Sequence, residues 1–341
     1  MTDFALLAIV TRGEVAESHH LGDLVIADAD GKVLRAAGNP ERVAYFRSAQ
    51  KPLSALAVVQ TGAADRFGLT ATELSICCAS HSGSRMHVVT VQGILEKLGL
   101  DETALQCGVH DPGDAEERAR LVRAGEKPSP LHNNCSGKHA GMLASALALG
   151  APVASYLERD HPLQRLIARN VAAMTGLPEE RLQYGADGCG APVIAVPLTA
   201  MATAYARLAN PADLPDDLHA AATRIVAAMA VAPDMVAAPG AFNSELLAAG
   251  EGRLVAKGGA EGAFLVGLQD PRRLGIAMKI ADGSSRALPS VTLAALEVVG
   301  GLSAGARGRL QRFRRPAVTN CHGTHVGDIE TTLELEATAH E

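Results

Sequence analysis

The stretch LVIADADGKVLRAAG, residues 24–38, decides the fold. Two runs of β-favouring residues flank Asp30-Gly31, a dipeptide typical of a two-residue hairpin turn. With the apolar run FALLAIV before it, residues 4–10, the hairpin predicts an antiparallel sheet at the start of the chain. Strand character returns late, in GRLVAKG (252–258), GAFLVGL (262–268), LGIAMKIADG (274–283) and near 327–335.

Helical patterns fill the middle of the chain. Apolar residues recur at spacings of three and four over 52–61, 85–98, 137–149, 162–175, 196–208 and 216–230, and again over 287–300. Strands followed by helices and then by strands favour an α+β fold over a doubly wound one. We therefore predict an antiparallel sheet flanked by helices, with a helical region.

The predicted organisation is a single catalytic unit, residues 1–341, with two subdomains. Residues 1–60 plus 250–341 form the sheet part, and residues 61–249 form the helical part. The Pro/Asp-rich stretch NPADLPDD, residues 210–217, is a candidate boundary inside the helical part. Hydrophobic residues make up 48% of the chain and aromatic residues only 3%, so we expect a large aliphatic core.

The charge and the apolar runs exclude several classes of partner. The net charge is −6 and no basic stripe stands out, which argues against a nucleic-acid partner. The apolar run at the N-terminus follows Asp3 and is too short for a membrane span or a secretory signal. We expect a cytoplasmic protein with no membrane partner, whose six cysteines are reduced thiols.

The stretch RSAQKPLSAL, residues 47–56, places Ser48 three residues before Lys51. Residues i and i+3 share one face of a helical turn, and the helix N-terminus favours an alkoxide over an ammonium. A lysine amine can take the proton of a serine once its pKa lies well below the value in water. The alternative is a capping serine beside a solvated lysine. Because Pro52 disfavours the α region at Lys51, we expect the helix to begin at Pro52.

Two further stretches combine small polar residues with glycine. CCASHSGS, residues 77–84, holds Ser80 and His81 on a turn suited to presenting backbone N–H groups. LVAKGGAEGAF, residues 254–264, places Lys257 before paired glycines that let a strand edge approach a ligand closely. Each could also be an ordinary loop, with a solvated lysine in the second.

Two glycine- and asparagine-rich stretches carry cysteines with other potential ligands. LHNNCSGKHAGML, residues 131–143, contains Cys135, and GADGCGAP, residues 185–192, contains Cys189. Two thiols on separate turns make half of a zinc site. The remaining zinc ligands could be water or the side chains of His132, Lys138, His139 and Asp187, and the sequence pattern does not choose among them. We predict that Cys77, Cys78 and Cys107 are core residues.

Six stretches together resemble the class 3 L-asparaginases, also called the inducible L-asparaginase II family. They are TRGEVAESHHLG (11–22), RSAQKPLSAL (47–56), CCASHSG (77–83), LHNNCSGKHAGML (131–143), DGCGAP (187–192) and AKGGAEG (256–262). The resemblance implies a fold similar to serine β-lactamases and glutaminases, a homodimer, and hydrolysis of L-asparagine to L-aspartate and ammonia.

The resemblance also implies roles for individual residues. Ser48 with Lys51 and Ser80 with Lys257 would form two Ser–Lys catalytic pairs. Zinc would be bound by Cys135, Lys138 and Cys189, with water, and the substrate by Arg47, His139 and Asp187. The alternatives are a glutaminase or β-lactam-recognising hydrolase on the same scaffold, or a zinc-braced binding protein without catalysis.

Overall fold

The computed structural model describes residues 4–337, and the chain divides into two units. The first comprises Met1–Ala49, Val196–Asn210 and Ala249–Glu341, and the second comprises Gln50–Ala195 and Pro211–Ala248. One of the boundaries therefore falls inside the Pro/Asp-rich loop. The observed division differs from the predicted one in three ranges: residues 50–60 belong to the helical unit, and residues 196–210 and residue 249 belong to the sheet unit.

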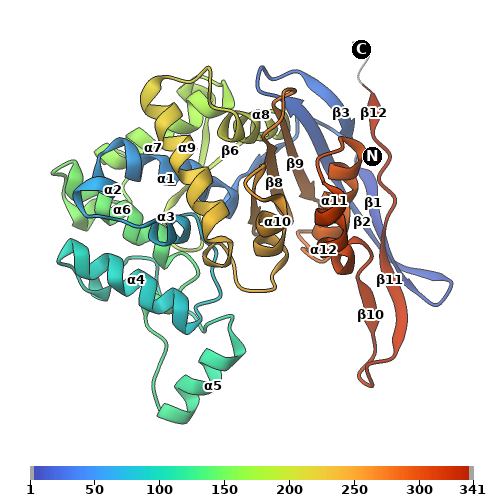
Figure 1. Ribbon diagram of the computed structural model, residues 1–341, viewed down its shortest axis with the longest axis horizontal. Helices are drawn as coiled ribbons and strands as arrows, with labels where there is room; N and C mark the ends of the chain where they lie inside the picture. The colour runs from blue at the N-terminus through green and yellow to red at the C-terminus, as the bar shows by residue number, and fades with distance from the viewer. Residues whose placement is uncertain (1–3, 338–341) are drawn as a thin grey trace. The chain divides into compact units, whose positions relative to one another are not determined.

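An antiparallel sheet of nine strands forms the centre of the first unit (Figure 1). Seven of its strands follow the order β10-β11-β1-β2-β9-β8-β7; β3 also pairs with β2, and β12 pairs with β3. The strands are β1 (Ala5–Arg12), β2 (Val15–Asp28), β3 (Val33–Ala37), β7 (Leu254–Gly259), β8 (Ala263–Leu268), β9 (Leu274–Ile280), β10 (Ala317–Thr319), β11 (His325–Thr331) and β12 (Glu336–Ala337). The short strand β4 (Val43–Tyr45) also belongs to this unit.

The predicted hairpin is confirmed. Strands β2 and β3 pair in antiparallel register, with Leu24 opposite Ala37. Asp28 Oδ1 accepts the backbone N–H groups of Asp30 and Lys32, and Gly31 takes a φ of 87°, a region that glycine enters at little cost. The turn chemistry of this one stretch thus fixes the register in which the sheet starts.

Helices cover both faces of the sheet. The helices of this unit are α8 (Leu198–Ala209), α11 (Leu288–Val298) and α12 (Ala304–Arg314). A Cβ added to Gly275 would point at the backbone of Ala202 in α8, whereas Met278 Sδ accepts the hydroxyl of Thr292 in α11. Residues 275 and 278 of one strand face opposite sides, so α8 and α11 pack on opposite faces of β9.

The second unit is mainly helical. Its helices are α1 (Lys51–Gln60), α2 (Ala63–Arg66), α3 (Ala71–Cys77), α4 (Arg85–Leu98), α5 (Ala115–Ala124), α6 (Ser136–Ala148), α7 (Pro162–Thr175), α9 (Asp216–Val231) and most of α10 (Phe242–Gly250). Helix α1 packs against α6, α7 and α9, which explains why its residues belong here and not with the sheet.

The helical patterns of the sequence are confirmed, α4 and α7 at the predicted residues. A strand pair inside this unit was not predicted: β5 (Gln183–Ala186) pairs with the first residues of β6 (Pro192–Pro197). Helix α1 begins at Lys51 rather than at Pro52, because a 3-10 turn, η1 (Arg47–Gln50), already sets a helical backbone at Gln50. The α+β fold class is confirmed by the structure itself. Within residues 4–337, none of the helices combines the length and apolar character required to cross a bilayer.

The close contact between α8 and the sheet depends on glycine. At Gly275 an added Cβ would overlap the carbonyl oxygen of Ala202, a backbone atom that has no rotamer in which to move away. We expect Gly275→Ala to lower the free energy of unfolding by about 3 kcal/mol, measured by urea denaturation. Gly308→Ala in α12 is the matched control, because its Cβ would meet nothing within 4 Å. It should be neutral or stabilising by up to about 1 kcal/mol, and equal losses in both variants would contradict the packing argument.

Candidate functional site

Lys51 is the most deeply buried cationic side chain of the predicted site, at 1% exposure. Its Nζ donates to the carbonyl of Ala79 at 2.5 Å and to that of Asn134 at 3.5 Å. It also lies 2.9 Å from Ser80 Oγ. A lysine nitrogen is thus held within hydrogen-bond reach of a serine hydroxyl, the arrangement of a nucleophile and its base.

Ser80 lies on the loop that follows α3. Its backbone N–H donates to the carbonyl of Val236 at 2.9 Å, and the next N–H, that of His81, donates to the carbonyl of Asn134 at 3.3 Å. The loop is therefore held from both sides by backbone hydrogen bonds. The contact between Ser80 and Lys51 is neither of the two expected pairs, which are Ser48–Lys51 from the spacing and Ser80–Lys257 from the resemblance.

Ser48 lies in the 3-10 turn η1, and the boundary between the two units falls between it and Lys51. The preceding residue, Arg47, has a φ of 49°, which is unusual for a side chain with a Cβ. Its guanidinium lies 3.9 Å from the carboxylate of Glu261 in the same unit. The pairs Ser48–Lys51 and Ser80–Lys257 stay predictions.

Lys257 lies in β7, is almost fully buried, and donates to the carbonyl of Gly258 at 2.6 Å. The glycine after it, Gly259, packs against the backbone before Ser48: an added Cβ would lie 2.7 Å from the carbonyl oxygen of Phe46 and 3.3 Å from the Cβ of Arg47. Gly259 therefore allows close approach of the chain itself, and the approach of a ligand to these glycines stays a prediction.

A cluster of sulfur and oxygen atoms lies in the second unit. The ligand atoms of Cys135, Asp187 and Cys189 all lie within 4.8 Å of one another, and the Nζ of Lys138 lies 3.0 Å from Cys189 Sγ. Cys135 immediately precedes α6, and Cys189 sits in a tight turn closed by a 2.9 Å bond from Asp187 N–H to the carbonyl of Ala191. We call these four residues the thiol cluster.

Glycines in α6 allow the thiol cluster to form where it does. A Cβ on Gly137 would overlap the carbonyl oxygen of Ile76 in α3, and one on Gly141 would lie 2.8 Å from Cys77 Sγ. The start of α6 thus lies directly on the end of α3. This contact brings Cys135 to the side of the loop that carries Ser80.

Electrostatics in the thiol cluster favour one thiolate beside one ammonium. A hydrogen bond from Cys189 lowers the pKa of Cys135 well below its ordinary value and raises that of Cys189. Burial acts to lower the pKa of Lys138, but the charge of the two cysteines outweighs it and the pKa is raised. Lys138 is therefore placed as the counterion of a buried thiolate.

The donor set of the thiol cluster fits zinc. Two cysteine sulfurs and a carboxylate oxygen are donors that zinc takes in proteins, and Lys138 can add a nitrogen only as a neutral amine, once a metal ion displaces its proton. Their mutual spacing is short enough for one ion to be shared among them. Asp187, which the resemblance assigns to substrate binding, thus also lies within reach of a metal held by both thiols.

His139 is completely buried on α6. Its Nδ1 lies 2.6 Å from the hydroxyl of Tyr156, which also accepts the N–H of Gln106 at 3.0 Å. The Nε2 of His139 finds no hydrogen-bond partner among residues 4–337. Burial, reinforced by Lys138, lowers the pKa of His139 well below its ordinary value. A neutral imidazole with one ring nitrogen available is the result.

Two groups of the site were not predicted from the sequence. Tyr156, which orients His139, lies in a stretch without a motif. The carbonyl of Asn134, which accepts from Lys51, is a backbone group that no motif marks. The prediction for three other cysteines is confirmed, since Cys77, Cys78 and Cys107 are buried among apolar residues. Burial raises the pKa of Cys77 to about 12, and that of Cys107 to about 12 as well. Cys321 is exposed.

The solved structures to which the chain is similar include a β-lactamase from Mycobacterium bovis, with a TM-score of 0.42 and 15% identity over 81% of this chain and 94% of that chain. A Bacillus glutaminase has a TM-score of 0.38 and 13% identity over 82% of this chain and 91% of that one. Mglu in its glutamate form has a TM-score of 0.42 and 16% identity, and here 82% of this chain matches 60% of that one.

No curated protein matches the chain. The family model described as L-asparaginase II matches residues 8–331, which takes in every residue of the site described above. The chain therefore belongs to the L-asparaginase II family.

Proposed function

We propose that this protein hydrolyses the side-chain amide of L-asparagine to L-aspartate and ammonia. Membership of the L-asparaginase II family supports an amidohydrolase. The observation that carries the proposal is the 2.9 Å contact between the buried Lys51 Nζ and Ser80 Oγ. The contact places a lysine amine, a potential proton acceptor, beside a serine hydroxyl that can pass a proton on, and amide cleavage requires both a proton acceptor and a proton donor.

In the proposed reaction, Ser48 attacks the amide carbon and its proton passes to Lys51. The assignment of Ser48 comes from the family resemblance, and that of Lys51 also from its contact with Ser80. The carbon–nitrogen bond breaks as the departing NH₂ group receives the proton that Lys51 took from Ser48, passed on through Ser80 and Lys257. Water then attacks the acyl-enzyme, releases aspartate and returns a proton to the serine. The net change is asparagine plus water to aspartate plus ammonia.

The substrate also presents an α-carboxylate and an α-amine. We assign Arg47 to the carboxylate because its guanidinium can form paired hydrogen bonds with it. We assign Asp187 to the amine, and the free Nε2 of His139 to a polar group of the substrate.

Zinc belongs to the same proposal. Cys135, Lys138 and Cys189 would hold the ion, with Asp187 as an oxygen donor in reach. A bound zinc ion would supply a fixed positive charge and act as a Lewis acid. The protein places the sulfurs of Cys135 and Cys189 close together and holds Lys138 beside them.

The substrate is tested by ammonia release from the purified full-length protein with L-asparagine and with L-glutamine, and by hydrolysis of a β-lactam. We expect a kcat/KM for asparagine at least about tenfold above that for glutamine, since one methylene in a fitted pocket discriminates by roughly that factor or more. A higher kcat/KM for glutamine or for the β-lactam than for asparagine would show that asparagine is not the preferred substrate. Metal binding without hydrolysis of any of the three would support the binding-protein alternative.

The catalytic residues are tested by Ser48→Ala, Ser80→Ala and Lys51→Met. We expect each to lower kcat by about a thousandfold or more, since removal of a nucleophile or its base usually costs several orders of magnitude. Ser54→Ala, a buried serine of α1 outside the proposed machinery, is the control and should keep wild-type kcat. Activity of Ser48→Ala within about tenfold of wild type would exclude Ser48 as the nucleophile.

Metal binding is tested with cobalt as a spectroscopic probe for zinc. We expect wild-type protein, once stripped by a chelator, to develop thiolate-to-cobalt absorption on titration, and Cys135→Ser or Cys189→Ser to lose it. Cys321→Ser is the matched control, because Cys321 is exposed and distant in sequence from both thiols. Zinc at about a hundred times its Kd should also stabilise the wild type by about 2.7 kcal/mol. Unchanged spectra in both cysteine variants would remove the thiol cluster as the metal site.

A further inference from the structure

The imidazole of His81 joins the loop of Ser80 to the start of α6. Its Nε2 lies 2.9 Å from the hydroxyl of Ser136, and the ring is 2% exposed. His81 directly follows Ser80, and Ser136 directly follows Cys135. One hydrogen bond therefore bridges the residue after a proposed catalytic serine and the residue after a proposed metal ligand.

The protons along this bridge can be assigned. Gly83 N–H donates to His81 Nδ1 at 3.1 Å, so this nitrogen carries no proton. Nε2 then carries the proton and donates to Ser136, whose own hydroxyl donates to the carbonyl of Leu131 at 2.9 Å. Burial and the neighbouring His87 lower the pKa of His81 well below its ordinary value, which agrees with a neutral ring. Every polar atom of the bridge is paired.

The surroundings hold the ring in one place. His81 stacks on His87, with ring centroids 4.9 Å apart and planes 16° from parallel. The loop turns at Gly83, where φ is 69° and an added Cβ would lie 2.6 Å from the carbonyl oxygen of His132. His87 in turn lies 2.7 Å from the hydroxyl of Ser84 and 3.0 Å from the carbonyl of Asp234.

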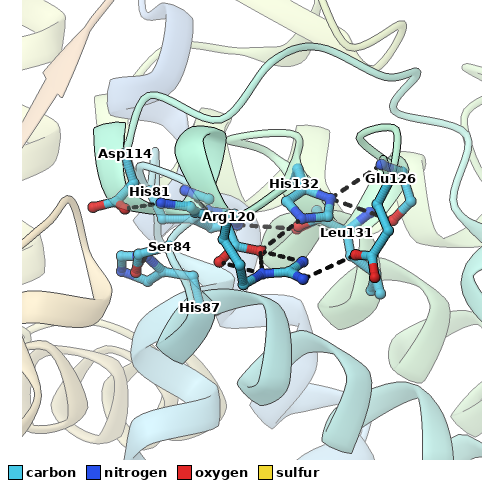
Figure 2. Close-up of polar contacts among 12 residues, drawn as sticks. His81, Ser84, His87, Asp114, Arg120, Glu126, Leu131 and His132 are labelled. Atoms are coloured by element: carbon cyan, nitrogen blue, oxygen red, sulfur yellow. Dashed lines mark hydrogen bonds and ion pairs between the residues drawn. The ribbon is translucent and has the colours of Figure 1, made fainter. Parts of the chain in front are cut away.

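The turn that carries Leu131, whose carbonyl accepts from Ser136, is also held by hydrogen bonds and ion pairs (Figure 2). The N–H of Ser129 donates to His132 Nδ1 at 3.0 Å, and His132 Nε2 lies 3.4 Å from a carboxylate oxygen of Glu117 on α5. Glu117 also pairs with Arg120, which reaches Glu126 at 2.9 Å. Figure 2 shows this chain of contacts running from His81 past His132 and Arg120 to Glu126. The carbonyl of Leu131, the last acceptor of the bridge, therefore belongs to a braced turn.

We propose that His81 and Ser136 are positioning residues, whose bridge fixes the spacing between Ser80 and Cys135. The kinetic part of this inference rests on the proposed function. Displacement of a reacting group by about 1 Å can cost about a hundredfold in rate, and loss of a contact behind a metal ligand about ten- to a hundredfold in affinity. A broken bridge should therefore change kcat and metal affinity together.

Two substitutions of His81 distinguish its hydrogen bond to Ser136 from its hydrogen bond with the N–H of Gly83 in the turn. In His81→Gln the side-chain amide nitrogen can replace Nε2 and still donate to Ser136. In His81→Asn the side-chain oxygen can replace Nδ1 and accept from Gly83 N–H, as an asparagine does in an Asx turn, but nothing reaches Ser136. Ser136→Ala removes the bridge from the other side. Ser145→Ala is its matched control, because the buried Ser145 bonds only within α6, to the carbonyl of Gly141.

The experiment uses the full-length protein and measures kcat, KM, cobalt Kd and the urea unfolding midpoint for each variant. We expect His81→Asn and Ser136→Ala to lose about ten- to a hundredfold in kcat and in cobalt affinity, with KM changed by less than about threefold. His81→Gln and Ser145→Ala should stay within about threefold of wild type in both quantities.

Two outcomes would overturn the proposal. One is wild-type kcat and cobalt affinity in His81→Asn, and the other is equal loss in His81→Gln and His81→Asn that follows their unfolding midpoints. If the wild type hydrolyses no amide, the cobalt affinities still decide, since they do not depend on catalysis. Failure of the proposed function and failure of the bridge are thereby told apart.

Discussion

A buried lysine nitrogen must find hydrogen-bond acceptors, and this constraint shapes the second unit around Lys51. A polar nitrogen left unpaired away from water costs a few kcal/mol, so the first turn of α1 is stable only with hydrogen-bond acceptors beside it. The carbonyls of Ala79 and Asn134 meet this need from the end of α3 and from the turn before α6. The same requirement that makes Lys51 tolerable in the core thus draws together the two segments that carry Ser80 and Cys135.

Those segments can meet only because α6 lacks side chains where it touches α3. Alanine at Gly137 would collide with a backbone carbonyl, whereas at Gly141 it would press on the side chain of Cys77. Close backbone approach then leaves little room for water, so polar atoms in this contact must pair with one another. The bridge from His81 to Ser136 is one such pairing, and its neutral ring follows from the same lack of water.

Much of the fold can be predicted from local sequence. The hairpin at Asp30-Gly31 and helices such as α4 follow from turn chemistry and from apolar spacing, both of which act over a few residues. The start of α1 could not be predicted in this way. Pro52 disfavours a helical backbone at Lys51, but the 3-10 turn η1 directly before Lys51 outweighs this preference. The strand pair β5–β6 was missed because six-residue apolar runs inside a helical region look alike whichever structure they adopt.

The site could be predicted as a set of residues but not as a set of contacts. Spacing along the chain pairs Ser48 with Lys51, whereas the structure brings Ser80, 29 residues away, to 2.9 Å from the same nitrogen. Likewise, Asp187 shares a turn with Cys189 in the sequence, but only the fold shows both beside Cys135. Long-range contacts depend on helix packing, which no short stretch encodes.

Hydrogen bonds hold Ser80 from several sides. Its backbone N–H donates to the carbonyl of Val236, and the next N–H, that of His81, donates to the carbonyl of Asn134. Its hydroxyl oxygen accepts from Lys51. Backbone hydrogen bonds contribute only about 1 kcal/mol each to folding, but each removes a direction in which the loop can move. The reaction proposed above passes a proton between Lys51 and Ser80, and small displacements of reacting groups are costly in rate. The paired carbonyls that make the buried lysine stable are therefore the same groups that make its contact with Ser80 rigid.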